Sequence, residues 1–233
     1  RQLEEIEGIS WIRLVYLHPQ MLKSDLIDYI SKSYKTLPYY DLPIQHIHDD
    51  MLSRMRRQVR REKIEGLLSE IRSKRPDSTI RTTFIVGFPG ETESHFGALY
   101  EFAESFKFDR MGAFAYSLEE GSSAALMPDQ VPEEDKALRL DTLNELQFEI
   151  VASKNRKLIG KEITALIDTV SAETSEAVGR TMADCPEIDP IIRIRQKING
   201  DKKSAALLKS GDIVRVLVTE TDGTDLIAEL KAA

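Results

Sequence analysis

The sequence has a single cysteine, Cys185, among its 233 residues. One thiol excludes an internal disulfide, and it excludes a metal or cluster site with several thiolate ligands built from these residues alone. Long apolar runs are lacking as well. None approaches the roughly 18 residues that a membrane-spanning helix needs, and no signal-peptide pattern opens the chain. These absences predict a cytoplasmic protein that makes no use of a membrane.

An excess of positive charge is also lacking. The chain has 32 Lys and Arg against 39 Asp and Glu, which gives a net charge of −7. Bulk electrostatics therefore do not predict a nucleic-acid-binding protein, and only a local basic patch would support one. With 41% hydrophobic and 30% charged residues, the composition is typical of a folded chain. Because the sequence starts at Arg1 and reads at once as the tail of a helix, we expect a piece of a longer protein.

The sequence contains no Walker loop, no GxGxxG fingerprint and no Ser–His–Asp order. Its first half instead alternates short apolar runs with amphipathic stretches. Strands are expected at residues 11–17, 37–44, 79–86 and 111–116. Helices are expected from Ser24, from Asp49 or Asp50 as one long helix to Pro76, and around residues 96–106. This alternation predicts an α/β fold: a parallel sheet with outer helices, either part of a TIM-like barrel or a partial doubly wound sheet.

The second half has a different pattern. One long helix is expected between Pro132 and Leu158, with Gly160 just beyond its end. After Lys161 the apolar residues recur with a period of two in five short segments, which predicts a small closed all-β barrel similar to an OB fold. We therefore expect a partial barrel over residues 1–126, a linker helix over 127–160 and a small barrel over 161–233.

Ligands of parallel α/β folds bind where strands end and helices begin. Polar or glycine-rich stretches follow the four expected strands, at residues 16–19, 43–48, 87–93 and 116–121. In the third, the glycines of Gly87-Phe88-Pro89-Gly90 allow a positive φ and close approach of a flat adenine or ribose. A tight turn without a ligand would have the same residues. Gln45 offers both a donor and an acceptor for a ribose or a carboxylate.

Other chemistry-bearing residues give weaker signals. Within the basic run of residues 54–63, Arg57 is the candidate for binding a ligand carboxylate, and the others are expected on a solvated helix face. Tyr116 and Glu119 follow the last expected strand, where they either contact substrate or solvate the rim. Cys185 has no basic neighbour, which indicates an incidental thiol.

The histidines do not predict a metal site. His46 and His48 are two residues apart at the end of an expected strand, and no third His, Cys or carboxylate has a matching spacing. Packing or hydrogen bonding is the more common role of such residues. His95 is expected on the surface of a helix, and His18 at the end of a strand.

Six strings resemble the methylthiotransferases, a branch of the radical S-adenosylmethionine enzymes. They are DLPIQH (41–46), MLSRMRR (51–57), RTTFIVGFPGET (81–92), FAYSLEEG (114–121), MPDQVPE (127–133) and GDIVRV (211–216). The resemblance is nearly continuous from Ile6 to Leu230. It implies a partial radical S-adenosylmethionine barrel followed by the family's TRAM domain, which is OB-like.

The resemblance is strongest to the branch that modifies a ribosomal protein. That branch has Gln-His and Glu-Glu-Gly where this sequence has Gln45-His46 and Glu119-Glu120-Gly121, whereas the tRNA-modifying branch usually has Ser-Gly and a Pro-Arg-Pro-Gly-like string. The implied reaction adds a methylthio group to the β-carbon of an aspartate in a small-subunit ribosomal protein. Two alternatives are a tRNA methylthiotransferase acting on isopentenyladenosine and a non-catalytic ribosome-binding module. An aldolase-like barrel is disfavoured, since no lysine or paired carboxylates stand at the strand ends.

Charge in the last segment supports a protein substrate. Residues 161–233 contain 10 basic and 13 acidic residues, a net of 10 − 13 = −3. An acidic module suits a basic ribosomal protein better than RNA phosphates. Arg193, Arg195 and Lys197 form the one basic stretch that leaves RNA binding open.

The resemblance also implies cofactors that these residues cannot hold. Family members bind two 4Fe–4S clusters, one on a Cys-x3-Cys-x2-Cys loop and one on three cysteines of an N-terminal domain, and they need an electron donor. Because Cys185 is alone, the cluster ligands and the catalytic residues are expected outside this sequence, and the chain by itself is expected to be inactive. The chain is expected to provide one side of the S-adenosylmethionine site, which we call the S-adenosylmethionine wall. It consists of Gln45, Arg57, Gly87, Phe88 and Pro89, and Tyr116 and Glu119 are expected to face the substrate.

Overall fold

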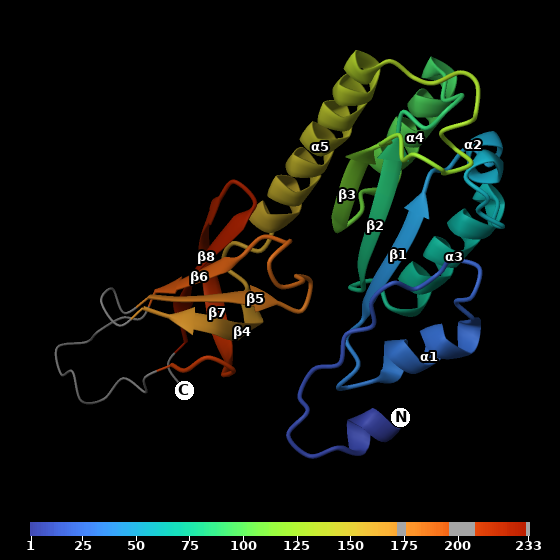
Figure 1. Cartoon of the computed structure of the whole chain (residues 1–233). Helices are drawn as coiled ribbons and strands as arrows, with labels where there is room; N and C mark the ends of the chain where they lie inside the picture. Colours follow the sequence, from blue (N-terminus) through green and yellow to red (C-terminus); the bar gives the residue numbers. More distant parts are fainter. Residues whose placement is uncertain (172–175, 196–207, 232–233) are drawn as a thin grey trace. The chain divides into compact units, whose positions relative to one another are not determined.

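A computed structural model describes residues 1–171, 176–195 and 208–231 of the chain (Figure 1). They divide into two compact units, residues 1–147 and 148–233. The first unit is a parallel sheet with helices, and the second is a closed β-barrel. The predicted α/β class with a following all-β barrel is therefore confirmed.

The sheet of the first unit has three strands in the order β1-β2-β3, and both strand pairs are parallel. The strands are β1 (Tyr39–Gln45), β2 (Thr79–Val86) and β3 (Arg110–Ala115). They match three of the four expected strands. Pro43 lies inside β1, and the pairing with β2 shifts register between Leu42 and Gln45, which is where a residue without an N–H would interrupt the ladder.

Helices connect the strands and bury one face of the sheet (Figure 1). The first unit contains η1 (Gln2–Glu5), α1 (Ser24–Lys32), α2 (Asp49–Arg54), α3 (Arg61–Lys74) and α4 (Glu93–Phe106). Along β2, residues alternate between fully and partly buried, so that Ile80, Phe84 and Val86 enter the core. Ile64 and Ile71 of α3 meet them there. The period-two pattern of β2 thus points its apolar face at the helices.

The strand expected over residues 11–17 does not form, and that prediction was wrong. Only Ile12 makes a bridge, with Thr36. Tyr16 adopts a positive φ of 58° and is 82% exposed, and its N–H donates to the Asp41 carboxylate at 3.0 Å. A left-handed residue with a side-chain partner breaks the extended run, so this apolar segment crosses beside β1 without a regular ladder.

The helix expected from residue 49 to Pro76 is two helices, α2 and α3, with residues 55–60 between them. Arg56 has a φ of 55° there, which ends α2. The N-cap of α2 is His48, whose Nδ1 accepts from the Asp50 N–H at 3.3 Å, and not Asp49 or Asp50. Ser24 is likewise the first residue of α1, and Lys23 is its N-cap. Apolar spacing continues through this break because Val59 in the loop is buried in the core and Met55 is partly buried.

The helix expected from Pro132 is α5 (Glu133–Arg156), and Gly160 follows it with a φ of 81°. Leu143 of α5 is buried in the core of the first unit. The helix ends at Arg156, and Gly160 is the last residue of the turn that follows it.

The second unit contains the five expected strands. They are β4 (Glu162–Val170), β5 (Glu176–Thr181), β6 (Ile192–Arg195), β7 (Ile213–Asp222) and β8 (Asp225–Leu230). They close a barrel in the order β4-β5-β6-β8-β7, around a core that includes Ile167, Ile194 and Val218. Among the described residues, no helix combines the length and apolar content that spanning a bilayer requires.

Candidate functional site

The carboxyl ends of the three parallel strands lie at one edge of the sheet. Gln45 pairs in register with Phe84 of β2, and Val86 pairs with Ala115 of β3. The Tyr116 N–H continues this pairing by donating to the Val86 carbonyl at 2.8 Å. The residues after β1, β2 and β3 therefore start from neighbouring points. This edge is where a parallel fold binds its ligand.

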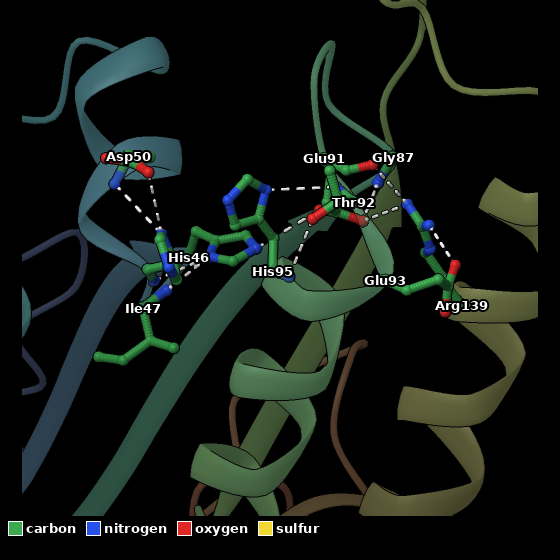
Figure 2. A network of polar contacts seen from close by, with 10 residues as sticks. His46, Ile47, Asp50, Gly87, Glu91, Thr92, Glu93, His95 and Arg139 are labelled. Carbon is green, nitrogen blue, oxygen red and sulfur yellow. Dashed lines mark hydrogen bonds and ion pairs between the residues drawn. The ribbon is translucent and has the colours of Figure 1, made fainter.

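A buried polar network runs across this edge, centred on Glu91 (Figure 2). One carboxylate oxygen of Glu91 accepts from the Gly87 N–H at 2.9 Å and from Arg139 Nη1 at 2.9 Å. The other, Oε2, lies 3.4 Å from His46 Nε2. His46 and Glu91 side chains have no solvent exposure. Glu91 thereby joins the turn after β2, the residue after β1 and helix α5.

The ring of His46 is held in one orientation. Its Nδ1 accepts from the N–H groups of Ile47 at 2.9 Å and His48 at 3.0 Å. With Nδ1 acting as an acceptor, the neutral ring carries its proton on Nε2, which faces Glu91. His46 thus points into the network. The His48 ring instead contacts the Asp50 N–H and the His95 ring.

Arg139 neutralises the buried carboxylate. Its Nη1 contacts Glu91, and its Nη2 donates to the exposed Glu93 at 2.6 Å. Burial acts to lower the pKa of Arg139, but the hydrogen bond that Arg139 donates to Glu93 and the charge of Glu91 outweigh it and raise the pKa. Arg139 is therefore a permanent cation, as a buried carboxylate requires. Neither Glu91 nor Arg139 was predicted from the sequence, because their pairing depends on where α5 packs.

The turn after β2 has the positive φ values that its glycines predicted. Gly87 has a φ of 68° and Gly90 a φ of 84°. A Cβ on Gly87 would lie 2.2 Å from Lys136 Cγ, and one on Gly90 would lie 2.4 Å from Arg54 Nη1. The side chains of Lys136 and Arg54 therefore occupy the space that a side chain at Gly87 or Gly90 would need. Phe88 and Pro89 between them are buried.

Buried polar atoms without a hydrogen-bond partner concentrate at this edge. Among the described residues, Gln45 Oε1, Arg57 Nε and Tyr116 Oη near the strand ends have no hydrogen-bond partner, and His46 Nε2 and Glu91 Oε2 have only each other, at 3.4 Å. A buried polar group without a partner costs about 1–3 kcal/mol. Folded proteins avoid such groups, and a cluster of them indicates a place where something else binds. Gln45 also holds a φ of 74°, a strained value of the kind that gathers at functional sites.

The other predicted site residues divide into two groups. Arg57 is half-buried, and its Nη2 donates to the Pro43 carbonyl in β1. Burial lowers the pKa of Arg57, and its charge adds to the burial that lowers the pKa of His18. The Tyr116 ring packs edge-on against Phe88 at 5.2 Å between centroids. Glu119, in contrast, is exposed, and among the described residues its carboxylate accepts from Ser117 Oγ at 3.1 Å.

A second cluster, of potential metal ligands, joins the residues after β1 to helix α4. Potential ligand atoms of His48, Asp50 and His95 all lie within 4.8 Å of one another. The sequence prediction found no third ligand for a metal because Asp50 belongs to the first turn of α2 and His95 to α4. His95 also completes the cap of α4, where its Nδ1 accepts from the Thr92 N–H at 3.2 Å. His95 lies in a helix, as predicted, and is partly exposed.

The comparisons with known proteins match both units of the chain. Residues 159–230 match the TRAM domain family. The chain is 42% identical to "Ribosomal protein uS12 methylthiotransferase RimO" of Carboxydothermus hydrogenoformans over 229 residues, which are 98% of the chain and 50% of that protein. The protein of the same name from Aquifex aeolicus is 42% identical over 225 residues, 96% of the chain and 50% of its own length.

The chain is a relative of these methylthiotransferases. This confirms the resemblance that the six strings predicted, and the chain spans about half the length of the curated relatives it matches. A solved structure, coproporphyrinogen III oxidase (HemN) from Escherichia coli, described as a radical SAM enzyme, matches with a TM-score of 0.50 and 14% identity. The match covers 74% of the chain and 44% of HemN. At this identity the match supports the fold alone, a parallel α/β sheet with helices.

Proposed function

We propose that this chain supplies the S-adenosylmethionine wall of a methylthiotransferase that modifies a small-subunit ribosomal protein. The names of its relatives support the class of reaction and the substrate. The observation that carries the proposal is the pair of unpartnered buried polar atoms on Gln45 and Arg57 at the strand ends. A nucleoside with a charged methionine tail offers partners for both.

The donor set fits that ligand. Gln45 Oε1 accepts from a ribose hydroxyl or an ammonium group, and Arg57 Nε donates to a carboxylate. The backbone of Gly87, Phe88 and Pro89 forms the adjacent wall, on which an adenine edge would lie. When bound, S-adenosylmethionine supplies the methyl group and the radical precursor of the reaction. The residues of this chain orient the ligand and exclude water from it.

Iron–sulfur clusters do not fit these residues. A 4Fe–4S cluster requires several thiolates, and the sequence has Cys185 alone. We therefore propose that two 4Fe–4S clusters, their cysteine ligands and the contact with an electron donor belong to polypeptide outside these 233 residues. The chain alone would then be inactive, and no catalytic residue is assigned within it.

We assign the substrate side to Tyr116 and Glu119, and the acceptor atom to the β-carbon of an aspartate. The small barrel supports a protein substrate over tRNA. Arg193 pairs with Asp222 and Asp225 at 3.1 Å, and Arg195 pairs with Glu220 at 3.3 Å. Lys197, the third member of the basic stretch, lies outside the described residues. Arginines already paired with carboxylates release fewer counterions from phosphates, so they add little RNA affinity.

We propose that the chain has three segments with separate roles. Residues 1–126 form part of the barrel, residues 127–160 are a linker helix, and residues 161–233 form the TRAM barrel that meets the ribosomal protein. We place the reaction in the cytoplasm, where that substrate is made.

The ligand assignment is tested by titrating the full-length protein with S-adenosylmethionine. Gln45→Ala and Arg57→Ala are expected to weaken binding about tenfold each, the effect of losing one hydrogen bond to a charged or buried partner. Matched controls are Gln20→Ala and Arg60→Ala, whose side chains are exposed. Unchanged affinity in both site variants would remove this edge as the ligand wall.

The substrate assignment is tested by offering the full-length enzyme the ribosomal protein and an isopentenylated tRNA side by side. Methylthio incorporation into the protein, located on an aspartate by peptide mass spectrometry, is the expected result. Incorporation into the tRNA instead would favour the tRNA-modifying branch. Incorporation into neither, with clusters intact, would favour a ribosome-binding module.

A further inference from the structure

We propose that His48, Asp50 and His95 bind one Zn²⁺ ion outside the S-adenosylmethionine wall. Their ligand atoms lie within 4.8 Å of one another, although His48 and Asp50 are at the start of α2 and His95 is in α4. Figure 2 shows Asp50 and His95 on these two separate helices. Ligands placed about 2.0–2.1 Å from a zinc ion stand up to about 4 Å apart. Small rotations of three partly exposed side chains are enough to close this difference.

The donor set is one that Zn²⁺ prefers. Two imidazoles and one carboxylate bind zinc in many proteins, and three protein ligands leave a fourth position for water. Asp50 brings a negative charge that offsets the cation, and its side chain is 74% exposed, so its carboxylate can turn toward the rings. The His48 and His95 rings already lie 4.3 Å apart between centroids, tilted by 56°. Two imidazoles at this distance offer nitrogens to one ion.

The surroundings of His95 favour a ligand role. The His95 Nδ1 accepts from the Thr92 N–H at 3.2 Å, which fixes the orientation of the ring and leaves Nε2 for the ion. A metal bound at Nε2 would displace the proton that this nitrogen carries while Nδ1 is an acceptor.

The ion would join two connections of the sheet. His48 and Asp50 follow β1 and begin α2, whereas His95 lies in the first turn of α4 after β2. Gln45 and Gly87 lie on the same two connections. A zinc ion here would therefore hold the turns that carry the proposed ligand wall, without contacting that wall. This inference is independent of the reaction, because its readout is metal binding.

Capping alone is the competing explanation for both histidines, and three variants separate it from metal binding. His95→Gln places glutamine at a position where it still completes a capping box. His48→Asn keeps a side-chain acceptor at the N-cap of α2. Asp50→Asn keeps the size of the side chain and removes its charge. Each preserves the helix ends and removes one ligand.

The experiment titrates the 233-residue chain, stripped with a chelator, with Co²⁺ followed by its d–d absorption, and then displaces Co²⁺ with Zn²⁺. One ion per chain is expected, with affinity reduced at least about tenfold in each of the three variants. His18→Gln and Cys185→Ser are the controls, since they alter a histidine and the thiol outside the cluster. Absence of one-to-one binding, wild-type affinity in His95→Gln, or loss of binding in Cys185→Ser alone would each overturn the proposal.

Discussion

His46 and Glu91 meet at 3.4 Å, Nε2 to Oε2, and neither side chain is exposed to solvent. Glu91 also forms an ion pair with Arg139, whose side chain is 6% exposed. A buried carboxylate is tolerated only where a cation and hydrogen bonds compensate it. This network therefore determines the shape of the turn that ends β2.

Replacing Glu91 should be costly, because Glu91→Gln leaves Arg139 with a buried, partly uncompensated charge. We expect the free energy of unfolding to fall by about 3 kcal/mol. Trp11, the only tryptophan, lies in the first unit, so its fluorescence during urea unfolding follows this unit. Glu93→Gln is the control: Glu93 contacts the same arginine but is 84% exposed, and should cost less than about 1 kcal/mol. Equal losses in the two variants would contradict the central role of Glu91.

The turn glycine gives a second prediction. Gly87→Ala forces a left-handed φ on alanine and brings its Cβ to 2.2 Å from Lys136 Cγ. We expect a loss of about 1–3 kcal/mol in the free energy of unfolding. Gly97→Ala is the matched control, because Gly97 is helical and has nothing within 4 Å of its Cβ position. That change should stabilise the protein by about 0.5–1 kcal/mol. Destabilisation by both substitutions, to the same extent, would refute this explanation of Gly87.

A third prediction concerns pH and the N-terminal segment. The Ser33 hydroxyl, followed by the Thr36 hydroxyl at 2.6 Å, hydrogen-bonds to Glu4 and holds its pKa at about 2, below the ordinary 4.5. A lowered pKa means that the carboxylate stabilises the fold fully above pH 4.5, and that this contribution is lost as the pH falls toward 2. Glu4→Gln should therefore unfold at lower urea than wild type at pH 7, with a smaller difference at pH 3. Glu5→Gln, at an exposed position, should show no such pH dependence, and a constant effect of Glu4→Gln would contradict the assignment.

Local patterns predicted most of the fold. The residues of β2 alternate in hydrophobicity and lack turn residues, so its bounds matched the prediction, and the five barrel strands followed from the same period of two. Residues 11–17 look equally apolar, but their N–H groups find partners at Lys35 and Asp41 in place of a ladder. The break between α2 and α3 depends on the left-handed Arg56, which apolar spacing does not reveal.

The candidate site was predicted in part. Gln45 and Tyr116 stand at strand ends, and this position alone was enough to select them. Glu91 and Arg139 are 48 residues apart, and only the packing of α5 shows that they pair. His95 was missed as a partner of His48 for the same reason: the contact joins two helices whose separation along the chain carries no periodic signal.

The most direct test of the account is a crystal structure of the full-length protein with S-adenosylmethionine bound. We predict that the ligand lies along the Gly87–Pro89 turn, donates a hydrogen bond to Gln45 Oε1 and accepts one from Arg57 Nε, because these two atoms lack partners here. Bound ligand elsewhere, with Gln45 and Arg57 satisfied by other parts of the polypeptide, would contradict it.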